Sequence, residues 1–473
     1  MKRFLSLLKI FFTKPEYVFV VPALVFGLLS AFLMPQLINN DENMHFIRSY
    51  QLTELEVNHK CTLPVDIKER GFYAMYTGDY PDYSFGTKKV DESSRVDTDC
   101  GTATSYNPLL HLPQTIGFAI AKLVWPTTGG MILFGRIANA LFYCIALFFI
   151  IRKARIGKWL LVVVGLIPMM IHMAGSLTGD VVNNVILLSF ITYMFNLFVQ
   201  KTAMSRKQIG ILVILSALLA VTKMTNLVLL LPVLFLPKNV LPTMTIKKKK
   251  IPKSFTKLII GGLCGIVAIS VIIVWAYLYG SSPAGGVDAA NPVSEKPYRF
   301  LKILFNTYVN SKVVLDGVSY GDWLLRGMFG GFASFSYWLP YSVTALLTGL
   351  IAFIGLRKEN DPDEKVPECA VKPLMASANI ALFLVISAMT YGLYVAWAIP
   401  VRGEGVQFAL GLQGRYFTPL IILLLPTLIY LRRFVSVNIK KGVATGILVF
   451  SIMTFSLIFY IVQTLNFIAT LPA

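Results

Sequence analysis

Long apolar segments recur along almost the whole chain and are separated by short polar links. A helix needs about 20 apolar residues to cross the hydrocarbon core of a bilayer, because unpaired backbone groups are too costly there. Hydrophobic residues make up 56% of the 473 residues and charged residues only 14%, which excludes an ordinary soluble globular chain. The sequence therefore predicts an all-α polytopic membrane protein, with one transmembrane domain over residues 1–473 embedded in the lipid bilayer.

The basic links between these segments predict the direction in which each one crosses. Lys and Arg residues are enriched in cytoplasmic links, and here they form short runs such as 152–155 and 247–250. The formal net charge of +19 therefore reflects orientation in the membrane, and we expect no nucleic-acid partner, because no separate basic domain is present to bind one. We expect a plasma-membrane protein with a cytoplasmic N-terminus, whose first apolar segment is too long for a signal peptide.

Eleven spans satisfy this arrangement and leave the C-terminus on the non-cytoplasmic side. We expect them at about Tyr17–Leu37, Met131–Ile151, Trp159–Met173, Val181–Val199, Ile209–Val221, Met224–Leu236, Leu258–Tyr279, Tyr337–Leu356, Ala376–Ile399, Tyr416–Leu431 and Ala444–Ile468. The fifth and sixth are short, so they are tilted, broken, or a pair that stops below the outer headgroups.

The longest polar stretch, residues 39–105, follows the first predicted span. It holds twelve of the 24 Asp and Glu residues against seven Lys and Arg residues, and a loop poor in positive charge belongs on the non-cytoplasmic side. Together with a juxtamembrane or re-entrant helix at Asn107–Trp125, it forms a first extracytoplasmic loop over residues 39–130. A second extracytoplasmic segment covers residues 280–336. Cys61 and Cys100 share the first loop and could form a disulfide, but sequence alone does not give their separation.

The first candidate site lies directly beyond the first predicted span, where Asp41 and Glu42 are followed by His45. In a helix, Asp41 and His45 would share one face. A carboxylate at a lipid boundary can act as a general base, since partial desolvation raises its proton affinity. The two carboxylates could also help to hold a divalent cation. The structural alternative is that Asn40 or Asp41 caps a juxtamembrane helix and Glu42 lies in its first turn.

The second candidate site is Arg415 with Tyr416, at the outer start of the tenth predicted span. A planar guanidinium suits a phosphate or a carboxylate, and an arginine on this side has no positive-inside explanation. The preceding Gly414 would let a bulky ligand approach the backbone. The structural alternative is that Arg415 snorkels to the lipid headgroups.

Three further charges, Arg136, Asp180 and Lys223, lie at the outer ends of other predicted spans. Charges at such depth are costly and normally pair with each other or with a ligand. A structural ion pair of Asp180 with Lys223 or Arg136 is the alternative to a role in binding. All the candidates nevertheless fall on one side of the membrane. The absence of a glycine-rich phosphate loop and of HExxH argues against a nucleotide-driven enzyme or a zinc protease.

The pattern Asp41-Glu42-x-x-His45-Phe46-x-Arg48 resembles a family of bacterial membrane proteins of formally unknown function, related to the GT-C superfamily of glycosyltransferases. Three other motifs look like that family: Ser105-Tyr106-Asn107-Pro108, Ser176-x-x-Gly179-Asp180 and Gly414-Arg415-Tyr416-Phe417-x-Pro419. The similarity extends over nearly the whole chain. It implies a GT-C-like arrangement of about eleven transmembrane helices.

Similarity to GT-C enzymes implies a polyprenyl-phosphate-linked sugar as donor and an extracytoplasmic glycan or glycolipid as acceptor, in the modification of cell-envelope polysaccharide. On this basis Asp41 would take the proton of the acceptor hydroxyl, and Glu42 would orient Asp41 or replace it. Arg415, helped by Lys223 or Arg136, would stabilise the departing lipid phosphate, and the anomeric carbon would be inverted. The remaining substrate contacts are expected from His45, Arg48, Tyr106, Asp180 and Tyr416. No cofactor is required beyond a divalent cation, if one binds.

Two other functions compete with glycosyl transfer. A transporter or flippase of lipid-linked glycans could use the same charges along a substrate path, but it predicts charges spread through the depth of the bilayer. A noncatalytic partner in envelope assembly would tolerate substitution of the two acids.

Overall fold

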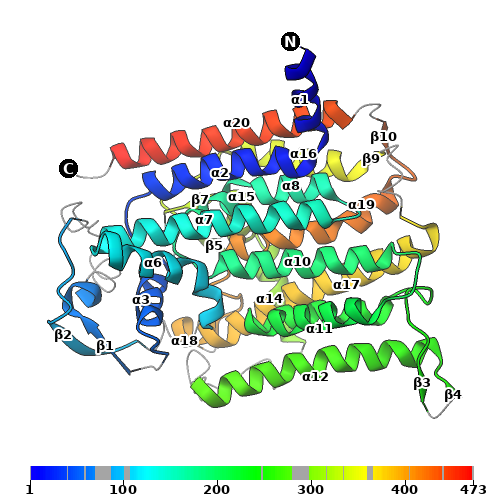
Figure 1. Ribbon diagram of the computed structural model, residues 1–473, viewed down its shortest axis with the longest axis horizontal. Helices are drawn as coiled ribbons and strands as arrows, with labels where there is room; N and C mark the ends of the chain where they lie inside the picture. The colour runs from blue at the N-terminus through cyan, green and yellow to red at the C-terminus, as the bar shows by residue number, and fades with distance from the viewer. Residues whose placement is uncertain are drawn as a thin grey trace.

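The long helices lie side by side along one common direction in the computed structural model (Figure 1). A small polar unit, made of residues 60–69 and 87–100, lies at one end of this bundle. The structure describes residues 2–39, 41–57, 60–69, 87–100, 107–246, 249–279, 298–315, 317–333, 335–358, 366–403, 405–438 and 442–470. Tyr106, one of the predicted substrate contacts, lies outside the described residues.

Six helices of the described part are long and apolar enough to cross a membrane. They are α2 (Pro15–Leu33), α7 (Thr128–Lys153), α10 (Asp180–Phe198), α12 (Lys253–Tyr279), α17 (Glu368–Leu393) and α20 (Gly442–Ala469). The helix α17 continues through one turn of π-helix, η5 (Tyr394–Ala398), into α18 (Ile399–Arg402). Each of the six overlaps a predicted span, so the prediction of an all-α membrane protein is confirmed.

The other five predicted spans are shorter or interrupted helices. They form α8 (Lys158–Leu166) with α9 (Pro168–Ala174), α11 (Arg206–Val221), the 3-10 helix η3 (Met224–Phe235), α16 (Tyr341–Leu356), and the 3-10 helix η7 (Thr418–Leu424) with α19 (Leu425–Leu431). Pro168 opens α9 at a break, because proline cannot donate a backbone hydrogen bond. A 3-10 helix rises about 2.0 Å per residue, so the 12 residues of η3 reach about 24 Å, against about 18 Å for an α-helix. The total of eleven crossings stays a prediction.

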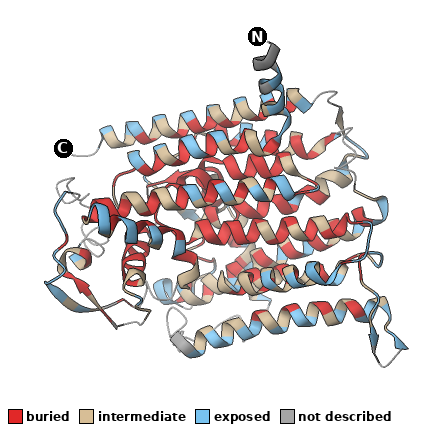
Figure 2. Cartoon of the chain, in the orientation of Figure 1, coloured by how far each residue is buried: buried red, intermediate tan, exposed pale blue. Residues whose placement is uncertain are grey.

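Burial separates the centre of the bundle from its rim (Figure 2). In the most apolar part of α10, 83% of the residues are buried inside the protein, whereas in α12 only 17% are. A helix that is apolar on all sides and largely uncovered by protein is stable in a nonpolar solvent and not in water. The helix α12 therefore faces lipid, and α10 forms part of the core.

The two ends of the bundle carry different short elements (Figure 1). One end carries short paired strands beside Lys and Arg residues, namely β3 (Thr245–Ile246) with β4 (Lys249–Lys250), and β9 (Arg357–Lys358) with β10 (Val437–Asn438). The other end carries α3 (Glu42–Thr53) and the strands β1 (Lys60–Pro64) and β2 (Arg95–Asp99). The basic links and the acidic loop thus lie at opposite ends, as the charge pattern predicted.

The stretch after the acidic loop forms a 3-10 turn, η2 (Pro108–His111), followed by α6 (Leu112–Val124). The 13 residues of α6 reach about 20 Å, which is too short to cross a bilayer, and Leu123 on its outer side is 86% exposed. Its inner side packs closely on α7, where a Cβ added to Gly117 would lie 2.3 Å from the carbonyl O of Phe134. The helix α6 is therefore too short for a span, and its placement as a juxtamembrane or re-entrant helix stays a prediction.

The remaining elements are short. They are α1 (Lys2–Thr13), α14 (Arg299–Tyr308), β5 (Val314–Leu315) paired with β6 (Val318–Ser319), α15 (Tyr320–Phe329), β7 (Gly331–Phe332) paired with β8 (Tyr337–Trp338), and η6 (Gly414–Tyr416). The span expected from Tyr337 starts as a helix only at Tyr341, because the first two residues pair with β7 and Pro340 precedes the helix.

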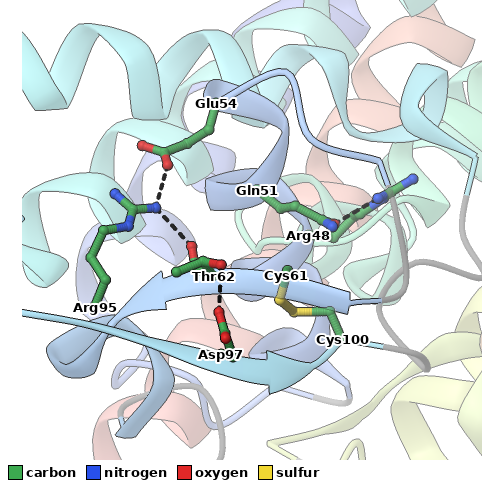
Figure 3. The surroundings of a disulfide bond; sticks show 8 residues. All are labelled: Arg48, Gln51, Glu54, Cys61, Thr62, Arg95, Asp97 and Cys100. Carbon is green, nitrogen blue, oxygen red and sulfur yellow. Dashed lines mark hydrogen bonds and ion pairs between the residues drawn. A yellow bond between two sulfur atoms is a disulfide. The ribbon is translucent and has the colours of Figure 1, made fainter.

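A disulfide between Cys61 and Cys100 closes the polar unit, with the two Cα atoms 6.0 Å apart. The strands β1 and β2 pair in antiparallel fashion beside it, a structure that the sequence analysis did not predict. Thr62 donates its hydroxyl to Asp97 at 2.7 Å, and Arg95 joins the carboxylate of Glu54 to the carbonyl of Thr62 (Figure 3). The disulfide left open by the sequence is therefore formed.

Counting thiols tests this disulfide. Protein purified without reductant, unfolded and alkylated, should gain three alkyl groups, at Cys144, Cys264 and Cys369, and five after reduction, as measured by intact mass. The double variant Cys61→Ser/Cys100→Ser should gain three under both conditions. Five alkyl groups without reductant would show that the disulfide is absent.

Candidate functional site

Four charged side chains from separate parts of the chain meet near the polar unit. Arg415 donates from Nη2 to Oδ2 of Asp41 at 2.8 Å, and its Nε lies 3.1 Å from Oδ2 of Asp180. The other carboxylate oxygen of Asp180 lies 3.2 Å from Nζ of Lys223. Opposite charges therefore alternate in the order Asp41, Arg415, Asp180, Lys223, and we call these four residues the charge cluster.

Asp41 lies at the N-cap position of α3, but its side chain does not cap the helix. Its backbone is left-handed, with φ 60° and ψ 10°, a conformation that Asp tolerates better than most residues. Its carbonyl accepts the N–H groups of Met44 and His45, while its carboxylate, with the side chain 45% exposed, contacts Arg415. Asp41 therefore occupies the expected N-cap position, with Glu42 in the first turn, but its side chain does not cap the helix. Asn40, the other expected cap, lies outside the described residues.

The Arg415 side chain is only 8% exposed. A snorkelling arginine keeps its guanidinium at the wet interface, whereas this one lies between two carboxylates, so the snorkelling alternative is wrong. Gly414 sets its position, because a Cβ there would lie 2.3 Å from the carbonyl O of Leu324 in α15. The missing side chain at Gly414 thus lets the backbone of α15 pack closely. The sequence analysis had expected a ligand in that space.

Asp180 links the two cations of the charge cluster. It opens α10, where the N-terminus of a helix favours a negative charge. The expected structural pair with Lys223 is formed, but Asp180 contacts Arg415 as well. Lys223 also lies over the ring of Tyr416, with Nζ 3.3 Å from the ring centroid, a cation–π contact. Tyr416 is therefore part of the same site.

Glu42 and Arg136 form a separate, buried ion pair. Nε and Nη2 of Arg136 donate to the two oxygens of Glu42 at 2.8 and 2.7 Å, and the side chains are 2% and 0% exposed. The amide of Leu177 also donates to Glu42, and Arg136 also donates to the carbonyl of Met34 beyond α2. This geometry corrects two expectations: Glu42 does not orient or replace Asp41, and Arg136 does not reach a lipid phosphate, because each is engaged inside the protein.

His45 lies beside the charge cluster and pairs with His111, whose role the sequence analysis missed. The Nδ1 of His45 lies 2.8 Å from Nε2 of His111, and its Nε2 lies 3.5 Å from the hydroxyl of Thr178. Burial lowers the pKa of His45 to about 4, although the carboxylates of Asp41 and Asp180 oppose the shift. Burial also holds the pKa of His111 well below its ordinary value. Both rings are therefore neutral at pH 7. The one sequence signal for His111 was a polar residue in an apolar stretch.

Arg48 is not part of the charge cluster, and the divalent-cation site considered for Asp41 and Glu42 is not formed by three or more ligands in the part of the chain that the structure describes. Arg48 is buried in α3 and donates to Gln51 of the same helix at 2.7 Å (Figure 3). No group of three or more His, Cys, Asp or Glu side chains among the described residues could hold a metal ion. Asp41 and Glu42, considered as cation ligands, instead bond to two different arginines.

The charge cluster suits acid–base chemistry on a molecule that carries an anion. A half-exposed carboxylate can take a proton from a bound hydroxyl, and an arginine with a neighbouring lysine can stabilise a phosphate. Among the described residues, Nη1 of Arg415 has no bonding partner, whereas Nη2 and Nε face Asp41 and Asp180. Arg415 can therefore bind one further oxygen without losing either carboxylate.

The two acids should differ sharply in their effect on stability. Glu42→Gln should lower the free energy of unfolding by about 3–5 kcal/mol, because it leaves the buried charge of Arg136 unbalanced. Asp41→Asn should change it by about 1 kcal/mol or less, because this carboxylate is half exposed. Thermal unfolding of both purified variants in one detergent tests this, and equal midpoints would contradict the assignment.

Acid should destabilise the site through His45. A pKa of about 4 in the folded protein against about 6.5 in the unfolded chain means that the unfolded chain binds more protons between these values. Stability should therefore be fully present above pH 6.5 and fall, by up to about 1.4 kcal/mol per pH unit, as the pH drops toward 4. Unfolding midpoints measured from pH 7 to 4.5 test this. His45→Gln should show a shallower dependence, and an unchanged slope would contradict the role of His45.

Comparison with known proteins identifies a family. A family model described as predicted membrane protein (DUF2142) matches residues 82–424. The matched region includes Asp180, Lys223 and Arg415, whereas Asp41 precedes it. Neither the curated proteins nor the solved structures gave a match.

Proposed function

This chain belongs to the DUF2142 family of predicted membrane proteins, and we propose that it is an inverting glycosyltransferase of the GT-C type. It would move a sugar from a polyprenyl-phosphate donor to an extracytoplasmic glycan or glycolipid. One observation carries the proposal: Arg415 contacts Asp41 at 2.8 Å across 374 positions of sequence. A displacement at a sugar phosphate requires a base and an anion-binding group held close together, and here the half-exposed Asp41 and the covered Arg415 are in direct contact.

In the proposed reaction Asp41 accepts the proton of the acceptor hydroxyl. The acceptor oxygen forms a bond to the anomeric carbon as the bond from that carbon to the phosphate oxygen breaks. The electron pair of the broken bond leaves with the polyprenyl phosphate, and one displacement inverts the anomeric carbon. Arg415 stabilises the charge that develops on the phosphate, and Lys223 adds a second cation 3.2 Å from Asp180.

An apolar groove lined in part by residues that follow Arg415 in the sequence supports a lipid-linked donor. It has a volume of about 420 Å³, and its lining includes Phe417, two residues after Arg415. Leu420 and Leu424 of η7 form one wall, and Tyr308 of α14 and Ile386 of α17 contribute to the others. A donor phosphate on Arg415 would therefore have apolar surface next to it for the first isoprene units of its chain.

The disulfide supports a non-cytoplasmic site, since disulfides persist in oxidising compartments. The ion pairs of the charge cluster and of Glu42 with Arg136 lie near the same end of the bundle, which favours an enzyme over a transporter that carries its substrate through the depth of the membrane. A flippase remains the rival function, and it would move a lipid-linked sugar without forming a new glycosidic bond.

Incubation of purified protein with polyprenyl-phosphate sugars and membrane glycolipid acceptors, followed by mass spectrometry, tests the proposal. The wild-type protein should form a product heavier than the acceptor by one sugar. Asp41→Asn should lower the rate by at least about a hundredfold, because the general base is lost, while the protein stays folded.

Asp97→Asn is the matched control, since this carboxylate bonds to Thr62 in the polar unit and should leave transfer unchanged. Wild-type transfer by the Asp41→Asn variant would remove Asp41 from the mechanism. Movement of the donor across vesicle bilayers without any transferred sugar would instead favour the flippase.

A further inference from the structure

We propose that a basic pocket at the start of α14 binds the phosphate group of an anionic bilayer lipid. The pocket has a volume of about 350 Å³ and lies between α14, η5 and the loop after α18. Arg299 and Lys302, one helical turn apart, supply its positive charge, and Tyr298 and Tyr394 supply aromatic walls. The site is distinct from the charge cluster, and the proposal does not depend on glycosyl transfer.

The two cations, Arg299 and Lys302, have no ion-pair or hydrogen-bond partner in the part of the chain that the structure describes. By contrast, Arg95, Arg136 and Lys223 are each paired with a carboxylate. Like charges one turn apart on a helix repel each other, so an anion bound between them stabilises the pocket. A planar guanidinium beside an ammonium suits the several oxygens of a phosphate.

The opposite wall of the pocket is already in place. Tyr394 donates its hydroxyl to the carbonyl O of Val406 at 3.0 Å, and Asn306 donates its side-chain amide to the carbonyl O of Gln407 at 2.9 Å. These bonds fix the loop after α18 against α14 and η5. The pocket is therefore preorganised, which reduces the conformational cost of binding.

The outer face of α14 identifies the source of the phosphate. Leu301, Phe305 and Val309 are 67%, 55% and 66% exposed, and their spacing puts them on one side of the helix. The ten residues of α14 reach about 15 Å, too short to cross a bilayer. A short helix with an exposed apolar face and a basic edge lies at the boundary between acyl chains and headgroups. Arg299 and Lys302 are thus at the depth of lipid phosphates.

Native mass spectrometry of the full-length protein with added phosphatidylglycerol or phosphatidylcholine tests the proposal. The wild-type protein should retain phosphatidylglycerol in preference to the zwitterionic lipid. Arg299→Gln/Lys302→Gln should bind phosphatidylglycerol at least about tenfold more weakly. The unfolding midpoint should stay unchanged, since neither side chain bonds to any of the described residues. Lys88→Gln/Lys89→Gln, which removes the same charge from the polar unit, should bind within about twofold of wild type.

Wild-type binding by the Arg299→Gln/Lys302→Gln variant would overturn the proposal. So would equal retention of the two lipids by the wild-type protein, a comparison that needs no variant and stands even if the double variant fails to fold. Displacement of phosphatidylglycerol by millimolar glycerol 1-phosphate, with no displacement by glycerol, would overturn the lipid as the source and leave a soluble phosphate as the ligand.

Discussion

The buried ion pair between Glu42 and Arg136 joins three parts of the chain, and the rest of the site depends on this connection. Arg136 belongs to α7, Glu42 opens α3, and the same guanidinium binds the carbonyl of Met34 just beyond α2. Desolvating two charges is costly, and a pair of this kind persists where its geometry satisfies both partners. The turn that carries Asp41 lies between Met34 and Glu42, so this pair fixes the position of Asp41 without contacting it.

The charge cluster differs from this pair, because one of its members, Asp41, keeps substantial contact with the exterior. Asp41 is half exposed, whereas Asp180 and Arg415 are largely covered. Alternating charges make the cluster neutral as a whole, so it adds no net charge near the membrane. Burying opposite charges in sequence also strengthens each contact beyond its value in water. A cluster of this kind can exchange one carboxylate contact for a phosphate contact and remain assembled.

Sequence reasoning found the members of the site but not their pairing. Asp180 and Lys223 were singled out because a charge near a span is costly, Asp41 because a carboxylate at a lipid boundary can act as a base, and Arg415 because an outer arginine suits an anion. Each of these arguments is local. Glu42 was expected to act with Asp41 as a second base. In the structure its side chain points into the core, where it pairs with Arg136. The long apolar helices were predicted for the same local reason. The interrupted helices, the strands of the polar unit and the His45–His111 contact depend on tertiary packing, which no run of residues reports.

The two sides of the site differ in how firmly they are built. Asp41 follows an α-helix end and precedes α3, and both are locked to α7 through Arg136. Arg415 and the residues after it lie in the 3-10 helices η6 and η7, whose hydrogen-bond geometry is poorer than that of an α-helix. A bulky ligand is therefore accommodated by movement of Arg415 and the 3-10 helices, while Asp41 keeps its position.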